Sequence, residues 1–182
     1  MPATRLLDWV RPAAPAVAID WEAVYTRELP RVYNYFRYRL GPGPLAEDLT
    51  SITFEKAWRS RSRYREERAA PQTWLLAIAR NVARDHFRRP SPTSPLSDAE
   101  EVADPETPEL LLARLQEERR LARLVAALAT RERELLALKY GAGSNNREIA
   151  RVTGLSESNV GTILHRTVQS LREAWKASGG DR

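Results

Sequence analysis

Residues 145–166 read NNREIARVTGLSESNVGTILHR, and this stretch decides the fold. Apolar residues recur at helical spacing on both sides of Gly154, which stands where a helix has to end in a left-handed residue. The pattern predicts two short helices joined by a tight turn. Such a helix-turn-helix presents its second helix to the DNA major groove, so the stretch indicates a chain that reads DNA.

Polar residues stand at the start of both predicted helices. Asn145 can cap the first helix, and Glu148, three residues later, can reach back to it. Either Ser156 or Ser158 can cap the second helix, since serine accepts hydrogen bonds from the free amides of a first turn. The sequence leaves open which of the two serines does so.

Composition favours a soluble cytoplasmic protein. The 182 residues suffice for one domain or two small ones, and there is no cysteine, so disulfides and thiolate metal sites are excluded. No stretch approaches the roughly 18–20 apolar residues of a membrane span. The N-terminus lacks the charged start and apolar run of a secretory signal, so we expect none.

Charge is distributed in blocks. Lys and Arg exceed Asp and Glu by 14 to 8 over residues 21–89 and by 12 to 7 over 110–178, whereas residues 90–109 carry six acids and no base. Basic blocks suit a phosphate backbone, although arginine also simply solvates helix surfaces. Two such blocks together with a helix-turn-helix favour nucleic acid as the partner.

Helical periodicity divides the chain into an all-α fold of two small domains. Before the acidic strip, apolar spacing predicts helices over 21–40, 45–60 and 71–89, with an Arg-rich loop between the last two. After the strip, we expect helices over 109–128 and 131–140, the latter capped by Thr130, and then the helix-turn-helix. We expect a flexible N-terminal extension at residues 1–20 and a first helical domain at 21–89. A flexible, acidic, Pro-rich linker at 90–108 then leads to a helix-turn-helix domain at 109–178.

Aromatic residues of the first domain allow two interpretations. Trp58 and Trp74 fall at core spacing. Tyr64 lies in the Arg-rich loop, where an exposed ring flanked by arginines suits stacking on single-stranded bases. From the loop alone, a ring that plugs the helix junction is slightly favoured.

We find no catalytic constellation, no metal-ligand cluster and no Gly-rich phosphate loop, so we expect no cofactor and no enzymatic activity. The only histidines are His86 and His165. His86 lies on an apolar stripe and is expected to be partly buried. His165 is expected on the exposed side of the second helix of the helix-turn-helix, where it can make a polar DNA contact.

Two sets of motifs resemble extracytoplasmic-function (group 4) sigma factors of bacterial RNA polymerase, in the sigma-70 family. One set resembles their region 2 and comprises Glu47-Asp48-Leu49, Phe54-Glu55-Lys56-Ala57-Trp58, Thr73-Trp74-Leu75, Ile78-Ala79-Arg80-Asn81, Asp85 and Arg88-Arg89. The other set is similar to their region 4 and comprises Leu128, Arg131-Glu132-Arg133-Glu134, Asn146-Arg147-Glu148-Ile149-Ala150, Leu164-His165-Arg166 and Leu171-Arg172. Their order, over residues 21–178, makes the match specific.

The resemblance implies three surfaces. One binds the clamp helices of core RNA polymerase, whose β and β′ subunits are the implied partners, through Asp48, Ser51, Glu55 and Lys56. Another reads and melts the −10 element and captures a non-template base, through Tyr64, Arg65, Arg68, Arg80, Asn81, Arg84 and Arg88. The third binds the −35 element as duplex, through Arg147, Ser156, Ser158, Asn159, Thr162, His165 and Arg166.

The resemblance also names a further candidate partner, an anti-sigma protein, and the chain departs from the family at Gly161 and Ile163. The family often has basic residues at these positions, so we expect an altered −35 preference. The leading function is that of a non-catalytic sigma subunit. The alternatives are a free-standing helix-turn-helix regulator on duplex operator DNA, and an interaction protein that docks another helical partner.

Overall fold

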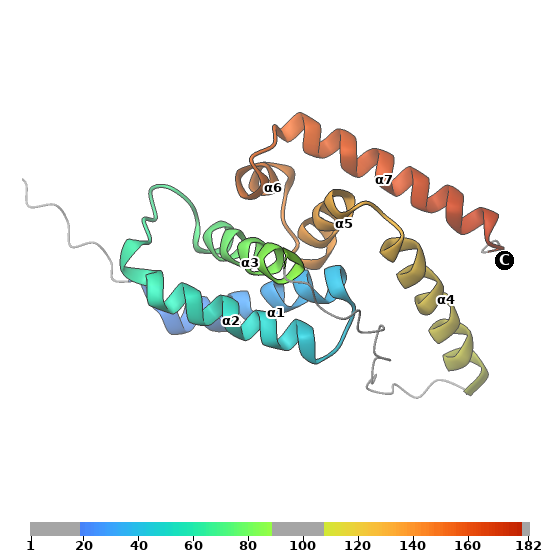
Figure 1. The fold of residues 1–182 in the computed structure, drawn as a ribbon, viewed down its shortest axis with the longest axis horizontal. Coiled ribbons are helices and arrows are strands. Elements are labelled where there is room, and N and C mark those ends of the chain that lie inside the picture. The colour runs from blue at the N-terminus through green and yellow to red at the C-terminus, as the bar shows by residue number, and fades with distance from the viewer. Residues whose placement is uncertain (1–18, 89–107, 180–182) are drawn as a thin grey trace, which may run out of the picture.

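The computed structural model describes residues 19–88 and 108–179, and every regular element in these ranges is helical, as the sequence predicts (Figure 1). The N-terminal half contains α1 (Trp21–Leu40), α2 (Pro44–Ser60), η1 (Arg61–Arg63) and α3 (Pro71–Arg88). The C-terminal half contains α4 (Pro108–Ala126), α5 (Thr130–Leu136), the π-type turn η2 (Ala137–Gly141), α6 (Asn146–Thr153) and α7 (Glu157–Ala177). Nearly all of the predicted linker and N-terminal extension lies outside the described residues.

Local sequence explains most helix starts. Asp20 Oδ1 accepts the Glu22 and Ala23 amides at 3.1 and 3.0 Å, and α2 and α3 each begin with a proline, whose missing N–H costs nothing there. The predicted Thr130 cap is wrong. The α5 N-cap position is Ala129, which has no capping side chain, and its amide donates to Glu132 Oε2 at 3.2 Å, which is the glutamate's half of a capping box.

The helix-turn-helix has the predicted geometry. The Asn145 and Glu148 side chains each accept the other's backbone amide at 2.9 Å, a reciprocal capping box. Gly154 ends α6 in the left-handed region, with φ of +77°. Ser156 caps α7 by accepting the Asn159 amide at 3.2 Å, whereas Ser158 lies inside the helix.

The first three helices pack around Tyr35 and Phe36 of α1 and Leu75 and Leu76 of α3, all at most 1% exposed. Trp74 packs partly buried against this core, as predicted. Trp58 is instead 56% exposed, so its predicted core position is wrong. Only one side of α2 faces its neighbours, since Leu45 and Ile52 are exposed as well.

The two halves pack directly against each other, which the sequence did not predict. In Figure 1, α5 and α6 lie against α3 and α1, and one continuous apolar core includes Tyr35 of α1 and Leu135 and Leu138 of the C-terminal half. At the closest point η2 contacts α1. A Cβ on Gly141 would stand 2.7 Å from the Asn34 carbonyl oxygen, so only glycine fits there.

This contact predicts opposite effects for two glycine substitutions. Gly141→Ala should lower the free energy of unfolding by roughly 1–3 kcal/mol, because its methyl group meets fixed backbone. Gly161→Ala, inside α7, should raise it by about 0.5–1 kcal/mol, because its Cβ would be 3.5 Å from Asn146 Nδ2, an ordinary contact. Urea unfolding followed by circular dichroism measures both. Equal stability of Gly141→Ala and the parent chain would contradict the packing of η2 on α1.

Candidate nucleic-acid interface

The outer face of α7 carries most of the predicted −35 residues. Val160, Leu164 and Thr167 are buried against the rest of the C-terminal half, which turns the opposite side of the helix to solvent. Ser158, Asn159, Thr162, His165 and Arg166 are all exposed, and so is the N-cap Ser156. Arg147 extends from α6 toward the start of α7, with its Nε 3.7 Å from Glu157 Oε2. These side chains form one polar surface that a major groove can accommodate.

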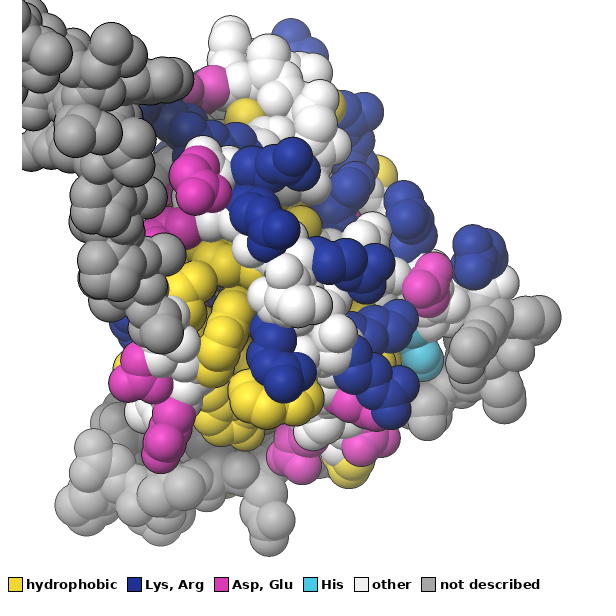
Figure 2. All heavy atoms as spheres, turned by 90° about the vertical axis from the view of Figure 1, so that its left-hand side faces the viewer, with side chains coloured by type: hydrophobic (Ala, Val, Ile, Leu, Met, Phe, Trp, Pro, Cys, Tyr) yellow, Lys and Arg dark blue, Asp and Glu magenta, His cyan; other side chains and the backbone are white. Residues whose placement is uncertain are grey.

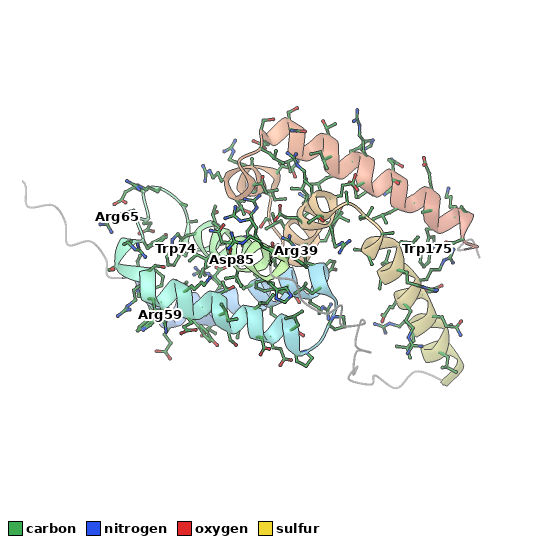
Figure 3. All side chains as sticks on the ribbon, in the orientation of Figure 1. Arg39, Arg59, Arg65, Trp74, Asp85 and Trp175 are labelled. Atoms are coloured by element: carbon green, nitrogen blue, oxygen red, sulfur yellow. The ribbon has the colours of Figure 1, made fainter. Side chains whose placement is uncertain are left out.

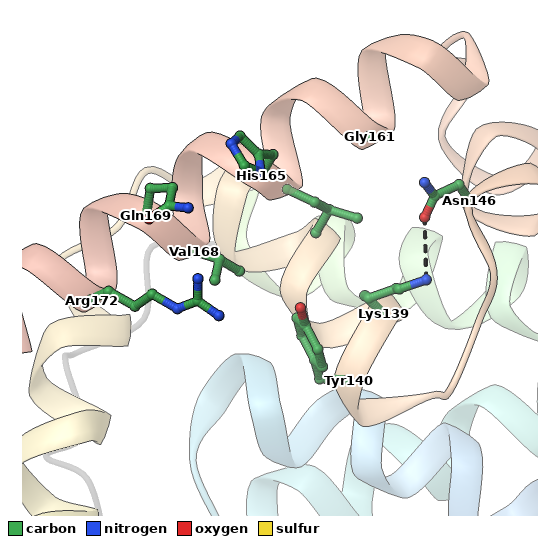
Figure 4. Close-up of a pocket in the computed structure, with 9 residues that line it drawn as sticks. Lys139, Tyr140, Asn146, Gly161, His165, Val168, Gln169 and Arg172 are labelled. Carbon is green, nitrogen blue, oxygen red and sulfur yellow. Dashed lines mark hydrogen bonds between the residues drawn. The ribbon is translucent and has the colours of Figure 1, made fainter.

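A groove of about 280 Å³ lies beside this surface, between η2 and α7 (Figure 4). Gly161 and His165 line its α7 side, and Lys139, which donates to Asn146 Oδ1 at 3.3 Å, lines the other. Arg172 adds a second positive charge. Sequence reasoning missed both residues: only the fold brings Lys139 to α7, whereas Arg172 lies on α7 itself, seven residues after His165, where helical spacing could have found it.

Three predicted −10 residues share one face of α3. Asn81, Arg84 and Arg88 follow each other at spacings of three and four, and all are exposed. Arg84 Nη2 donates to Asn81 Oδ1 at 3.2 Å, which orients the amide, and Arg88 Nη2 lies 3.5 Å from Asp85 Oδ1. This face presents an amide beside two cations, a combination suited to a base edge next to phosphates.

Arg80 does not join that face. Its guanidinium is directed to the C-terminal half, where Nε lies 3.2 Å from Glu134 Oε1, and its side chain is 29% exposed. The structure therefore separates Arg80 from the other predicted −10 residues of α3.

Tyr64 is not an exposed ring, and the expectation that it is available for stacking is wrong. It is 6% exposed, and its hydroxyl donates to the Ala69 carbonyl at 2.8 Å. The ring packs against Trp74 and Trp21, with centroids 5.0 and 5.5 Å away. Burial, with nearby Glu66 and Glu67, raises the pKa of the Tyr64 phenol. The plug at the helix junction, which the loop sequence slightly favoured, is the position observed.

The neighbouring loop arginines remain available. Arg65 and Arg68 are exposed, and Arg65 Nη1 donates to the Ser62 and Tyr64 carbonyls at 3.0 and 2.9 Å. Figure 2 shows the end of the molecule to which the loop belongs, where Lys and Arg side chains lie above and to the right of an apolar strip. Figure 3 shows Arg65 extending from the loop, away from the helices. The buried Tyr64 thus anchors a loop whose charges face solvent.

Trp58 is the exposed aromatic that sequence reasoning missed. Arg61 lies over its ring, with the guanidinium carbon 3.9 Å from the centroid, and donates to the Trp58 carbonyl at 2.7 Å. A stacked arginine holds the indole in place and adds charge beside it. The Arg-rich stretch after Trp58 could have indicated an exposed ring, but helical spacing predicted a core position for this residue.

Exposed residues of α2 form a third surface. Asp48, Ser51, Glu55 and Lys56 are all exposed, at spacings of three, four and one. Glu55 Oε1 pairs with Arg59 at 2.5 Å, and Lys56 Nζ lies 3.7 Å from Asp85 of α3. The exposed Leu45 and Ile52 accompany these charges. An apolar and acidic helix face of this kind suits a protein partner.

Other site types find no support in residues 19–88 and 108–179. No group of three or more His, Asp or Glu residues there could hold a metal ion. No helix in these ranges is both long and apolar enough to span a bilayer. His86 is half-buried with its ring 5.5 Å from Phe87, as predicted, and His165 is exposed.

Two substitutions distinguish the role of the exposed Trp58 from that of the buried Tyr64. Trp58→Ala should weaken binding of fluorescein-labelled oligo(dT) to the free chain by roughly 1–3 kcal/mol, the contribution of one stacked base. Tyr64→Phe keeps the ring and loses only the hydrogen bond to Ala69, so it should leave that affinity unchanged and lower stability by about 1 kcal/mol. Fluorescence anisotropy measures the affinities. The reverse order of the two affinities would contradict the assignment.

Comparison with known proteins places these surfaces in a family. The Sigma-70 region 2 family matches residues 24–92, and Sigma-70, region 4 matches residues 118–171. The chain is 32% identical to the RNA polymerase sigma factor CarQ of Myxococcus xanthus, over 84% of this chain and 87% of that protein. It is 31% identical to the ECF RNA polymerase sigma factor BldN of Streptomyces coelicolor, over 92% of this chain but only 64% of that longer protein.

Solved structures agree on the fold. The sigma factor RpoE of Bartonella quintana, in complex with the anti-sigma factor NepR, aligns with a TM-score of 0.69 at 20% identity, over 86% of this chain and 97% of that one. CnrH in complex with the cytosolic domain of CnrY aligns with a TM-score of 0.57 at 24% identity, over 86% of each chain. The chain therefore belongs to the extracytoplasmic-function group of the sigma-70 family, the promoter-recognising sigma factors of bacterial RNA polymerase.

Proposed function

We propose that this sigma factor divides promoter recognition between its two halves, with α7 reading the −35 duplex and the α3 face together with the η1–α3 loop opening the −10 element. The observation that supports the proposal is that the predicted −35 residues on α7 and most of the predicted −10 residues on α3 and its preceding loop are exposed, on opposite halves of one chain. A protein that only reads duplex DNA needs the α7 surface but not the second one. Residues 21–89 and 109–178 are the proposed units of this division.

For the −35 element, we assign Asn159, Thr162 and His165 to base edges and Arg147 and Arg166 to phosphates. Ser156 and Ser158 flank the helix start, where free amides attract a phosphate. Gly161 and Ile163 offer no charge to the DNA. Recognition of the base pairs that face these two residues therefore depends on DNA shape and on the groove beside α7.

For the −10 element, we assign Asn81 to an extruded non-template base and Arg65, Arg68, Arg84 and Arg88 to the backbone beside it. Extruding a base costs a few kcal/mol, which hydrogen bonds and stacking have to offset. Trp58 with its stacked Arg61 supplies a platform that Tyr64 cannot, because Tyr64 is buried. The role of Tyr64 is to hold the loop in place.

The exposed face of α2, with Asp48, Ser51, Glu55 and Lys56, is the proposed contact with core polymerase. In this assignment the chain is a non-catalytic subunit that acts in the cytoplasm, where polymerase and promoters are. An anti-sigma protein is a further proposed partner, because two structural relatives are complexes with NepR and with the cytosolic domain of CnrY.

A free-standing helix-turn-helix regulator is not favoured. Such a protein needs the α7 surface but neither the arginine loop nor the acidic and apolar face of α2. Run-off transcription with purified core polymerase, with and without this chain, tests the choice. The proposal requires promoter-dependent transcripts and co-elution with core. No transcript from a promoter panel, together with no co-elution, would contradict it.

Asn81→Ala should slow open-complex formation at least tenfold while changing duplex binding little, because its amide serves an extruded base. Gln116→Ala is the control, since it removes an exposed amide from α4, outside the proposed surfaces. Stopped-flow fluorescence with a 2-aminopurine in the −10 element gives the opening rate. If Asn81→Ala impaired duplex binding and open-complex formation equally, Asn81 would have no specific role in melting.

Arg166→Ala should weaken −35 binding and reduce the slope of log affinity against log salt by about one. Without this cation, binding neutralises one phosphate fewer and releases one counterion fewer from the DNA. Arg123→Ala, which removes an exposed arginine from α4, should leave the slope unchanged. Affinities of the holoenzyme measured at several salt concentrations provide the test, and a parent-like slope in Arg166→Ala would exclude a phosphate contact.

A further inference from the structure

We infer that the free chain is held closed by an ion-pair latch in which Glu134 of α5 binds Arg39 of α1 and Arg80 of α3. The closure itself is a property of the fold. The consequence for DNA rests on the proposed function and extends it: Arg80, a predicted −10 residue that Glu134 holds away from the others, would join the −10 surface once it is released.

The centre of the latch is a buried pair. Arg39 Nη1 donates to Glu134 Oε1 at 2.8 Å, and the two side chains are 5% and 12% exposed. The same nitrogen donates to the Tyr35 hydroxyl at 2.6 Å, and the guanidinium lies 5.0 Å from the centroid of Phe87. Figure 3 shows Arg39 where the N-terminal helices meet α5. Burial raises the pKa of Tyr35 to about 12, against the opposing effect of Arg39, so this hydroxyl stays neutral.

The other arm of the latch engages a predicted DNA contact. Arg80 Nε lies 3.2 Å from the same Glu134 oxygen, and Nη1 reaches the Val152 carbonyl of α6 at 3.5 Å. One carboxylate of the C-terminal half thus holds two cations of the N-terminal half. While it does so, Arg80 is not free to bind a phosphate.

The cleft around this carboxylate is strongly basic. It encloses about 480 Å³, and its charged lining residues are Arg39, Arg80, Arg84, Arg131 and Glu134. Glu134 is therefore the only acid among five charged groups. It occupies the position in the cleft that a phosphate oxygen of DNA would take, and a polyanion that enters the cleft competes with it.

Apolar packing gives the latch a defined geometry. Leu135 and Leu138 are fully buried against the N-terminal half, and Gly141 fits against the Asn34 backbone. Because salt screens buried charges weakly, the latch should survive ionic strengths that weaken surface pairs. Removing one partner of a buried pair leaves the other charge uncompensated, so a single substitution at Glu134 should open it.

The substitution Glu134→Gln tests the latch, with Glu118→Gln as the matched control. Glu118 lies on α4 with its side chain 49% exposed and pairs with Arg114. Both changes remove one negative charge and raise the net charge of the chain by one, so any general gain in DNA affinity is the same. Glutamine keeps the shape of the side chain and a carbonyl acceptor for Arg39, which limits the effect on folding.

Single-molecule energy transfer reports closure directly. The chain has no cysteine, so Thr26→Cys and Ser170→Cys, both at exposed positions, can carry the dyes. We expect one compact population for the parent and for Glu118→Gln, and at least a tenfold lower ratio of closed to open molecules for Glu134→Gln. Circular dichroism checks that all variants are folded. A Glu134→Gln chain as compact as the control would overturn the latch.

Binding of fluorescein-labelled oligo(dT) to the free chain tests whether Glu134 keeps Arg80 from binding DNA. Glu134→Gln should bind at least tenfold more tightly than Glu118→Gln, and Glu134→Gln/Arg80→Gln should lose most of that gain. Equal affinities of the two single variants would overturn the masking of Arg80. Neither measurement uses polymerase, so a failure of the proposed function would appear in run-off transcription while these results stand.

Discussion

The contact between the Glu134 carboxylate and Arg39 is the interaction on which the arrangement of this molecule depends. Two halves that each have their own helices would otherwise meet mainly through apolar surface, which has little directional preference. A buried ion pair is satisfied in one geometry, and here it joins α1 to α5 beside the fully buried Tyr35 and Leu135. Buried pairs add less to stability than their short distances suggest, so the pair is better understood as specifying which surfaces face each other.

The same geometry explains why the two nucleic-acid surfaces differ in availability. The outer face of α7 is directed away from the contact between the halves and remains exposed. The basic face of α3 borders that contact, so Arg80 is engaged while Asn81 and Arg88 are exposed. A sigma factor has to bind two separated DNA elements, and a closed chain offers one of them incompletely. If the inferred latch closes the free chain, polymerase or promoter DNA has to supply the free energy that opens it.

Much of the secondary structure could be predicted, because its signals are local. The capping box at Asn145, the left-handed Gly154 and the prolines that open α2 and α3 act within a few residues, and the helix-turn-helix follows from them. The aromatic positions could not be predicted in the same way. Tyr64 is buried because Trp21, more than 40 positions away, packs against its ring, whereas Trp58 stays 56% exposed with only an Arg61 side chain stacked on it. The contact of Glu134 with Arg39, 95 residues apart, leaves no periodic signal at all.

The central claim, that one half anchors the chain on duplex DNA while the other opens the strands, is tested most directly by permanganate footprinting on a promoter mapped for this holoenzyme. Permanganate modifies unpaired thymines. The account predicts reactive thymines on the non-template strand at the −10 element, with protection of the −35 element, only when the chain and core polymerase are both present. Protection of a duplex site by the chain alone, with no reactive thymines in the presence of core, would contradict it.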